Sequence, residues 1–395
     1  MATKLTNTQI QTLVNNAYNE AVGTTSAETM LDITDFCERG TAEIGADLRE
    51  KFFGKLLGVI TKNWYVDSSY RSNYKDVFFE DSEMFGAITQ MISVECPKAK
   101  ESSAWKDFAT GQTIGTYEIF LPVVDTNLYV KSSSWAIPIT IGEEQLRTAF
   151  RNAGELSQFV SFVWLSVDNA IVQHLEDMNN LNRNGFIATK LNATAKNVAG
   201  IHALDLVKEY CVNRGVANMT VSEFMANKDA LLFATEQIAL YIGYMKKQTN
   251  LFNTKSKTHF VPDDRLVVQI LDYFEKRLNT VALSGTFHKE LVDLPLHSTV
   301  PAWQSMADLS FDGVSSINVT VTGEDGNPVQ INRGGIIGLI ADKWCIVHTT
   351  RGQRVASQRF DIENLTHYEH QFRDSYMINT GLNAVVLVLN DYTAA

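Results

Sequence analysis

The last sixty residues alternate short apolar runs with polar breaks, a pattern typical of successive β-strands. Strands are predicted at 336–340, 344–348, 354–360, 372–378 and 384–389. The run at 384–389 contains only Ala, Val and Leu, so we expect it to be buried on both faces, between elements already in place. No catalytic motif lies in this region, which indicates an architectural part rather than an enzyme.

The strongest helical period covers residues 155–180. Its apolar stripe consists of Leu156, Phe159, Val160, Val163, Val167, Ala170, Ile171, Leu175 and Met178. Asn152 fits the N-cap of this helix and Gly185 fits a stop. At 1.5 Å per residue the helix is about 39 Å long, and we expect it to be covered on more than one side.

Between residues 65 and 141 the pattern changes to extended segments, at 84–95, 116–124 and 127–141. The stretch between the first two is polar and rich in small residues. Two strands that flank such a tip predict a projecting ribbon, which has little core of its own and needs another surface to lie on. An ordinary hairpin packed on its own domain is the alternative.

The remaining chain divides into an N-terminal arm and an α/β unit. Segments 8–21 and 48–60 carry amphipathic stripes without a self-contained core. For residues 200–330 the pattern predicts helices at 203–212 and 222–247, a strand at 260–262, a helix at 266–278, and a turn at 322–328 between two strands. Thr220 or Ser222 is the expected cap of the second helix, and Asp263 or Asp264 that of the third.

The composition, the net charge and the cysteines limit which class of protein this chain can belong to. The 395 residues carry a formal charge of −11, so the basic footprint of phosphate binding is missing. The four cysteines, Cys37, Cys96, Cys211 and Cys345, lack metal or redox spacing, and we expect them to be reduced and structural. No signal-peptide pattern and no run of about 20 apolar residues occurs, which indicates a soluble protein made in the cytoplasm.

Candidate chemistry is sparse. His367 and His370 flank Glu369, but a third ligand is missing, so a polar surface segment is the favoured interpretation over a zinc site. Asp263 and Asp264 precede a helical stripe, which favours capping over a pair of catalytic carboxylates. The glycines at 334, 335 and 338 do not form a dinucleotide fingerprint, and no phosphate loop or nucleophile elbow occurs.

The predicted ribbon tip carries the only candidate binding group. It consists of Lys98, Trp105, Lys106 and Phe108, with Lys100 beside them. Lys and Trp together are compatible with nucleic-acid binding. Because Glu101 and Asp107 nearly cancel the local charge, a protein contact anchored by Trp105 and Phe108 fits better.

The order of these parts resembles that of the major capsid proteins of tailed bacteriophages. The segments 142–150 and 155–160 look like the loop-to-helix transition of small podophages of the phi-twenty-nine type. The closing segment is similar too, through Asp342-Lys343-Trp344, Tyr376, Asn379 and 383–386. The likeness covers roughly 65–391, and the fold is one shared with herpesvirus capsids and encapsulins.

The resemblance implies an α+β fold in five parts. These are an N-terminal arm at 1–64, an extended β-hairpin loop at 65–141, a peripheral domain with a spine helix at 142–199, an axial domain at 200–334, and return strands of the peripheral domain at 335–395. The loop-tip residues then become a contact between subunits.

The function implied is self-assembly into pentamers and hexamers of an icosahedral or prolate head around double-stranded DNA. The implied partners are further copies of the chain, a portal, and scaffolding or decoration proteins, with only weak non-specific contact to DNA, no membrane and no cofactor. The place implied is the virion. Two alternatives stay open: an encapsulin-like nanocompartment shell, and an enzyme of unrecognised class.

Overall fold

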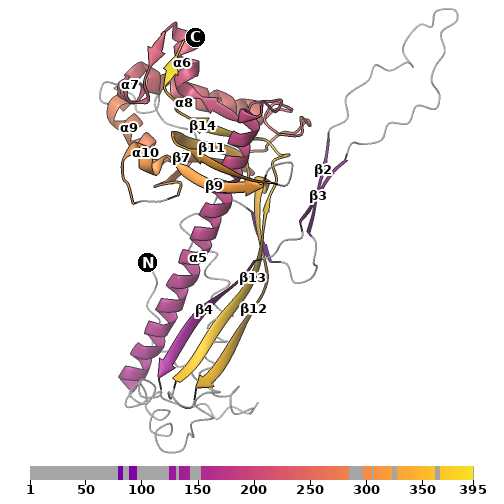
Figure 1. The fold of residues 1–395 in the computed structure, drawn as a ribbon, viewed down its shortest axis with the longest axis vertical. Coiled ribbons are helices and arrows are strands. Elements are labelled where there is room, and N and C mark those ends of the chain that lie inside the picture. The colour runs from indigo at the N-terminus through magenta and orange to yellow at the C-terminus, as the bar shows by residue number, and fades with distance from the viewer. Residues whose placement is uncertain are drawn as a thin grey trace, which may run out of the picture.

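The computed structural model describes residues 79–82, 89–95, 124–129, 133–142, 153–283, 297–304, 307–322, 327–360 and 365–394. One helix, α5 (Ala153–Ala195), has 43 residues and is therefore about 65 Å long. In Figure 1 it runs from an α/β unit at one end of the molecule down beside a long sheet. Among the described residues, no helix has both the length and the apolarity needed to cross a bilayer.

The long sheet has the strand order β1-β12-β13-β4. Its strands are β1 (Phe79–Ser82), β12 (Ile346–Phe360), β13 (Leu365–Ile378) and β4 (Ser133–Gly142). Alternate residues of β13 are buried, as expected for a sheet with one covered face. On that face the Trp135 ring stacks on Phe372 at 4.1 Å and lies 4.0 Å from the ring of His174, so α5 provides the cover.

A second sheet forms the centre of the α/β unit, in the order β5-β14-β11-β7-β8. Its strands are β5 (Ala203–Asp205), β14 (Ala384–Val388), β11 (Ile336–Asp342), β7 (Leu266–Leu271) and β8 (Ser298–Val300). Every residue of β11 and β14 is buried, which places these two strands in the middle of the hydrophobic core.

Short helices and strand pairs surround this second sheet (Figure 1). The helices are α6 (Leu206–Arg214), α7 (Val221–Ala226), α8 (Lys228–Met245), α9 (Asp272–Leu283), α10 (Phe311–Val314) and the 3-10 turn η3 (Lys343–Cys345). The pairs are β9 (Ile317–Thr322) with β10 (Pro328–Arg333), β6 (Asn218–Met219) with β15 (Tyr392–Thr393), and β2 (Thr89–Val94) with β3 (Val124–Tyr129).

Trp303, which is fully buried, joins α5 to the second sheet. Its indole Nε1 donates to the Ile336 carbonyl oxygen at 2.7 Å, and its own carbonyl oxygen accepts from Asn184 Nδ2 at 2.6 Å. The guanidinium of Arg183 lies 5.0 Å from the centre of the indole ring. A cation over an aromatic face, sealed from water, is worth up to about 2 kcal/mol. Both sheets are thus tied to the same helix.

The long helix is confirmed, but its predicted end is wrong. Helix α5 continues through Gly185 to Ala195. A glycine inside a helix costs about 1 kcal/mol relative to alanine, and packing against neighbours overrides that cost. A Cβ at Gly185 would lie 3.6 Å from Ile378 Cδ1 of β13, an ordinary van der Waals distance, so β13 packs against the helix there without requiring a glycine. The predicted cap Asn152 lies outside the described residues, as does the N-terminal arm 1–64.

The predicted helix at 266–278 is wrong in its first half, which is strand β7. Helix α9 begins only at Asp272, so neither Asp263 nor Asp264 caps it. Asp263 instead pairs with Lys246 at 2.6 Å on the surface. Residues 260–262 form no strand; the neighbouring Thr249 and His259 make only an isolated bridge.

The helix predicted at 222–247 is two helices, α7 and α8, with Asn227 between them. The Asn227 side chain accepts from the backbone of Asp229 and Ala230 and so starts α8. The Thr220 cap is confirmed, since Thr220 and Glu223 form a reciprocal capping box at the start of α7. The helix predicted at 203–212 begins later, because Ala203–Asp205 is strand β5.

The last sixty residues divide between the two sheets. The strands expected at 344–348 and 354–360 are one strand, β12, preceded by η3, and β13 begins at Leu365 rather than at 372. Only β12 and β13 join the long sheet, whereas β11 and β14 complete the α/β unit. Similarly, β1 and β4 fall inside the predicted loop 65–141 but pair with β12 and β13. The hairpin at 322–328 is confirmed by the pairing of β9 with β10.

Candidate interaction surface

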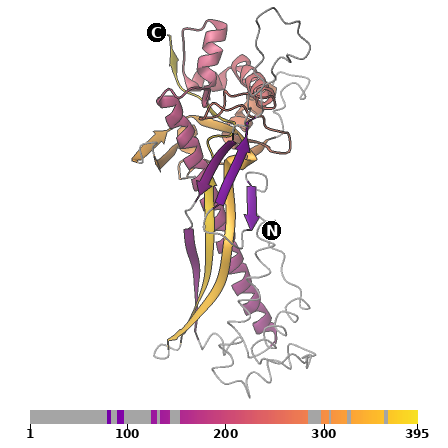
Figure 2. The same cartoon turned by 90° about the vertical axis from the view of Figure 1, so that its right-hand side faces the viewer.

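The predicted contact residues Lys98, Trp105, Lys106 and Phe108 lie outside the described residues. The base of the predicted ribbon is described. β2 lies within the first predicted segment, 84–95, and pairs antiparallel with β3, from Thr89 opposite Tyr129 to Val94 opposite Val124. Of the second predicted segment, 116–124, only Val124 lies among the described residues, and it begins β3; the segment predicted at 127–141 is divided between β3 and β4. Figures 1 and 2 show this pair beside the main body, separate from both sheets.

The two faces of this ribbon differ in chemistry. Because side chains alternate along a strand, one face carries Ile92, Val94 and Val124, while the other carries Asp125 and Asn127. The three apolar side chains are 61%, 56% and 48% exposed, in that order. We call this the outer face. These three exposed aliphatic groups, two on β2 and one opposite them on β3, make the outer face a candidate contact site.

The other, inner face is polar and contacts the body. The ammonium of Lys255 donates to Asp125 Oδ2 and to Asn127 Oδ1, both at 2.7 Å. Lys257 Nζ lies 3.4 Å from Asp125 Oδ1, and the backbone of Thr258 donates to Glu95. Burial raises the pKa of Asp125, but hydrogen bonds and attraction from Lys255 and Lys257 outweigh it and leave this pKa below its ordinary value.

The two histidines of the candidate zinc site, His367 and His370, lie on strand β13 and not on a helix. Residues three apart on a strand face opposite ways, so His367 and His370 cannot share an ion. His367 Nδ1 lies 3.0 Å from Thr140 Oγ1, while His370 is fully buried, and its burial lowers the pKa to about 4. The interpretation of 367–370 as a surface segment is wrong for Tyr368 and His370, because the α5-covered face of the sheet buries both.

The glycine cluster serves close packing between strands. Gly335 has φ +74°, a backbone conformation that favours glycine, and a Cβ there would lie 2.1 Å from the carbonyl oxygen of Leu389. At Gly338 a Cβ would lie 2.9 Å from the carbonyl oxygen of Gln269 on the neighbouring strand β7. The close contacts at Gly335 and Gly338 account for these two glycines, so no nucleotide-binding site is needed to explain them.

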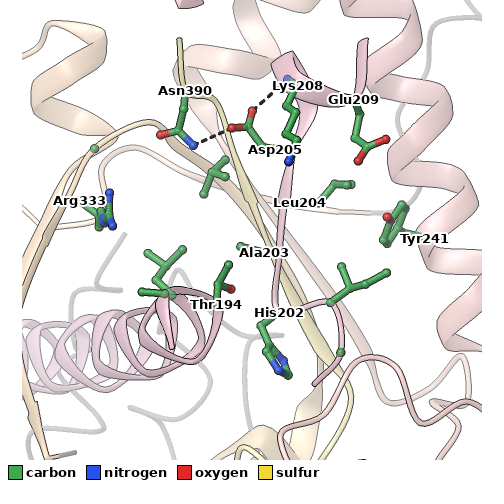
Figure 3. Close-up of a pocket in the computed structure, with 16 residues that line it drawn as sticks. Thr194, His202, Ala203, Leu204, Asp205, Lys208, Glu209, Tyr241, Arg333 and Asn390 are labelled. Atoms are coloured by element: carbon green, nitrogen blue, oxygen red, sulfur yellow. Dashed lines mark hydrogen bonds between the residues drawn. The ribbon is translucent and has the colours of Figure 1, made fainter. Parts of the chain in front are cut away.

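A cavity of about 460 Å³ lies where α5, β5 and α6 meet (Figure 3). Its wall includes Asp205, Lys208, Tyr241 and Arg333. The carboxylate of Asp205 is already used, since it accepts from two backbone groups at the start of α6 and from Asn390 Nδ2 at 2.8 Å. No group of three or more metal-ligating side chains occurs in the described part of the chain.

The two described cysteines, Cys211 and Cys345, are free and buried, in agreement with the expectation for them. Burial raises the pKa of both thiols, so the reactive thiolate is disfavoured. Cys37 and Cys96 lie outside the described residues.

Comparison with known proteins gives a consistent result. One protein family, described as Phi29-like phage major capsid protein, matches residues 10–388. No curated protein matches the chain. The capsid of Staphylococcus phage Andhra is 12% identical, with 81% of this chain and 84% of that chain covered and a TM-score of 0.48. The mature capsid of bacteriophage PhiM1 is 8% identical, with 81% and 87% covered and a TM-score of 0.43.

Proposed function

Because this chain belongs to the Phi29-like phage major capsid protein family, we propose that the outer face of the β2–β3 ribbon joins each subunit to the next. The protein is a structural component of the virion capsid and forms the phage head; it is not an enzyme. Both the enzyme and the nanocompartment alternatives are therefore set aside. A head built of this chain is a homo-oligomer, which requires surfaces where one copy binds another.

The exposure of Ile92, Val94 and Val124 supports this proposal. Each of these three side chains is already about half buried, so its full burial against a neighbouring copy would contribute roughly 1 kcal/mol. The contact is heterologous, because the ribbon of one copy meets a different surface on the next. Such contacts close into rings when the rotation between copies closes.

The two units of the fold then take different places in the ring. We assign the five-stranded sheet and its helices to the axial domain, around fivefold and sixfold axes. We assign α5 and the long sheet to the peripheral domain, and 83–132 to the extended loop, with Lys98, Trp105, Lys106 and Phe108 at its tip. Pentamers and hexamers, a portal, and scaffolding or decoration proteins complete this assembly. The charge of −11 favours only weak contact with the packaged DNA.

Substitution of Val94 by Asp tests the outer face. The side chain is 56% exposed, so the subunit should fold while a buried contact between copies is lost. We expect soluble V94D subunits that form no shells in negative-stain images and sediment as unassembled species. Leu309→Asp is the control, because Leu309 is 68% exposed and lies in the loop before α10, outside the ribbon. Normal shells from V94D would contradict the proposal. An equal loss of shell assembly in L309D would contradict it too.

Removal of residues 97–112 tests the tip separately. The truncated subunit should keep the thermal unfolding midpoint of the full chain, since the deletion leaves β2, β3 and both sheets in place. Assembly should fail if the tip makes an intersubunit contact. Shells of normal size from this variant would show that the tip is not part of the proposed contact.

A further inference from the structure

The ribbon is held against the body by a short hairpin, residues 249–259, that follows α8. We propose that Lys255 and Lys257 of this hairpin position the ribbon, by holding its inner face and so fixing the direction in which the outer face points. The proposal rests on the proposed function of the outer face as the contact between subunits. We call the hydrogen bonds and ion pairs among Lys255, Lys257, Asp125 and Asn127 the ribbon clamp.

The clamp has the geometry of a directional attachment. One ammonium, that of Lys255, reaches both Asp125 and Asn127 at 2.7 Å, so it contacts two alternate residues of β3 at once. Asn127 Nδ2 also donates to Asn379 Oδ1 at 3.4 Å, which adds a second contact of the same side chain with the body. Hydrogen bonds depend on angle, whereas apolar contacts do not, so these contacts define an orientation.

The charges of the clamp are partly shielded from water. The side chain of Asp125 is 13% exposed, that of Lys257 is 22% exposed and that of Lys255 is 35% exposed. Pairs at this depth are screened less than surface pairs. By contrast, the Lys246–Asp263 pair, at the other end of the same loop region, has side chains 43% and 79% exposed. It has the same chemistry, and no hydrogen bond or ion pair joins it to the described part of the ribbon, so it serves as a control for the removal of one lysine charge.

The hairpin that carries the two lysines is itself rigid. Asn253 is fully buried, and its side chain donates to the Lys257 carbonyl oxygen at 2.7 Å and accepts from the Lys257 backbone at 3.0 Å. Ser256, between the two lysines, has φ +52°, which turns the chain sharply at the tip. The lysines are therefore presented from a fixed turn and not from a loose loop.

The hairpin is also fixed to both parts of the core. The carbonyl oxygen of Phe252 accepts from Lys190 of α5 and from the backbone of Ala384 at the start of β14. Asn383 Nδ2 donates to the His259 carbonyl oxygen at 2.9 Å. An unbroken series of bonds thus runs from the core, through the hairpin, to the ribbon, and it sets the ribbon direction relative to the core.

The experiment compares the assembly rates of purified full-length subunits, followed by light scattering. Lys255→Met keeps the aliphatic stem and removes the charge, and we expect assembly about tenfold slower than in the wild type, equivalent to the loss of one good directional contact. Lys255→Arg keeps the charge and the donors, and should restore most of the rate. Lys246→Met, which removes the same charge from the control pair, should assemble at the wild-type rate.

A double variant tests whether the two partners act together. Asp125→Asn should slow Lys255→Met by a smaller factor than it slows the wild type, because the Lys255–Asp125 contact is already lost and only the Lys257–Asp125 pair is left to remove. Equal thermal unfolding midpoints for all the variants would show that the fold itself is intact. A merely stabilising role of Lys255 would lower the midpoint in step with the assembly rate, and that result would overturn the proposal.

The remaining outcomes are distinct. Wild-type rates from Lys255→Met, or rates in the double variant that multiply the two single effects, overturn the clamp while leaving the capsid function in place. If Lys246→Met slows assembly as much as Lys255→Met does, the clamp is also overturned, since the change in net charge alone then explains the effect. If V94D subunits form normal shells, it is the proposed function of the outer face that fails.

Discussion

The ammonium group of Lys190 on α5 donates a 2.9 Å hydrogen bond to the carbonyl oxygen of Phe252, and both residues are buried. Burial lowers the pKa of Lys190 to about 8, although attraction from Cys345 opposes part of this effect. The charged lysine is thus less stable in the folded chain than in the unfolded chain. His202 is a further titratable neighbour, and its own pKa is lowered by burial and then by Lys190.

This lysine makes stability depend on pH in the alkaline range. Between about pH 8 and 10.5 the unfolded chain binds a proton that the folded chain has lost, so the free energy of unfolding rises with pH. Lys190→Met should remove this rise, which amounts to about 3 kcal/mol at most. Urea unfolding of both proteins at pH 7.5 and pH 10 measures it, and the same change with pH in both would contradict the prediction. Ala384 still bonds to Phe252 in the variant, so we expect it to fold.

His370 makes stability depend on pH in the acidic range. Its pKa is lowered to about 4 by burial, so the unfolded chain takes up a proton first as the pH falls below 6.5. The free energy of unfolding should fall by up to about 3 kcal/mol between pH 7 and pH 4 on this account. His370→Phe should flatten that part of the curve, whatever its effect at pH 7. A variant with an unchanged slope between pH 6.5 and 4 would show that other groups cause the loss.

Gly335 and Gly334 are neighbours with opposite tolerance for a side chain. Gly335→Ala would place a Cβ 2.1 Å from the Leu389 carbonyl oxygen at φ +74°, so one of the strands must shift. We expect a loss of about 2 kcal/mol or more and a lower thermal midpoint. Gly334→Ala meets no atom within 4 Å and is the control, expected to differ from the wild type by less than about 0.5 kcal/mol. Equal midpoints for the two variants would refute the close contact.

Val167 and Val163 lie one turn apart on α5 but differ in burial. Val167 is 1% exposed, while Val163 is half-buried. Val167→Asp should leave an unpaired charge in the core, at a cost above about 3 kcal/mol, and give insoluble protein. Val163→Asp should be less damaging and leave soluble subunits. The soluble fractions of both variants after expression measure this difference. A smaller soluble fraction for Val163→Asp than for Val167→Asp would show that the buried face of α5 is assigned wrongly.

The sequence predicts those elements in which buried and exposed side chains alternate with the regular period of a helix or a strand. The stripe of α5 follows the helical period because one face of that helix packs along the long sheet, and the Thr220 capping box is a purely local signal. Strand β2 also follows from local alternation, as does the hairpin of β9 and β10.

The errors arose where tertiary packing decides. Leu266, Val267, Ile270 and Leu271 match the helical period, yet they form the strand β7, which is buried in the middle of a sheet. A strand covered on both faces is apolar throughout, and its residues therefore satisfy either period. The pattern predicts a stop at Gly185 because a local pattern cannot include contacts with residues almost two hundred positions away, such as Ile378 of β13. The same limit explains why the pattern predicts His370 at the surface.

The two strands that flank the ribbon, β1 and β4, are the opposite edges of the long sheet. The chain leaves that sheet at one edge and returns at the other, so changes of length between β2 and β3 alter no pairing register inside it. Changes of length in this region should therefore cost the subunit little folding free energy. Because the proposed contact between copies lies on the same segment, their effect would fall on shell assembly instead, so the subunit fold and the assembly of the head can vary separately in this chain.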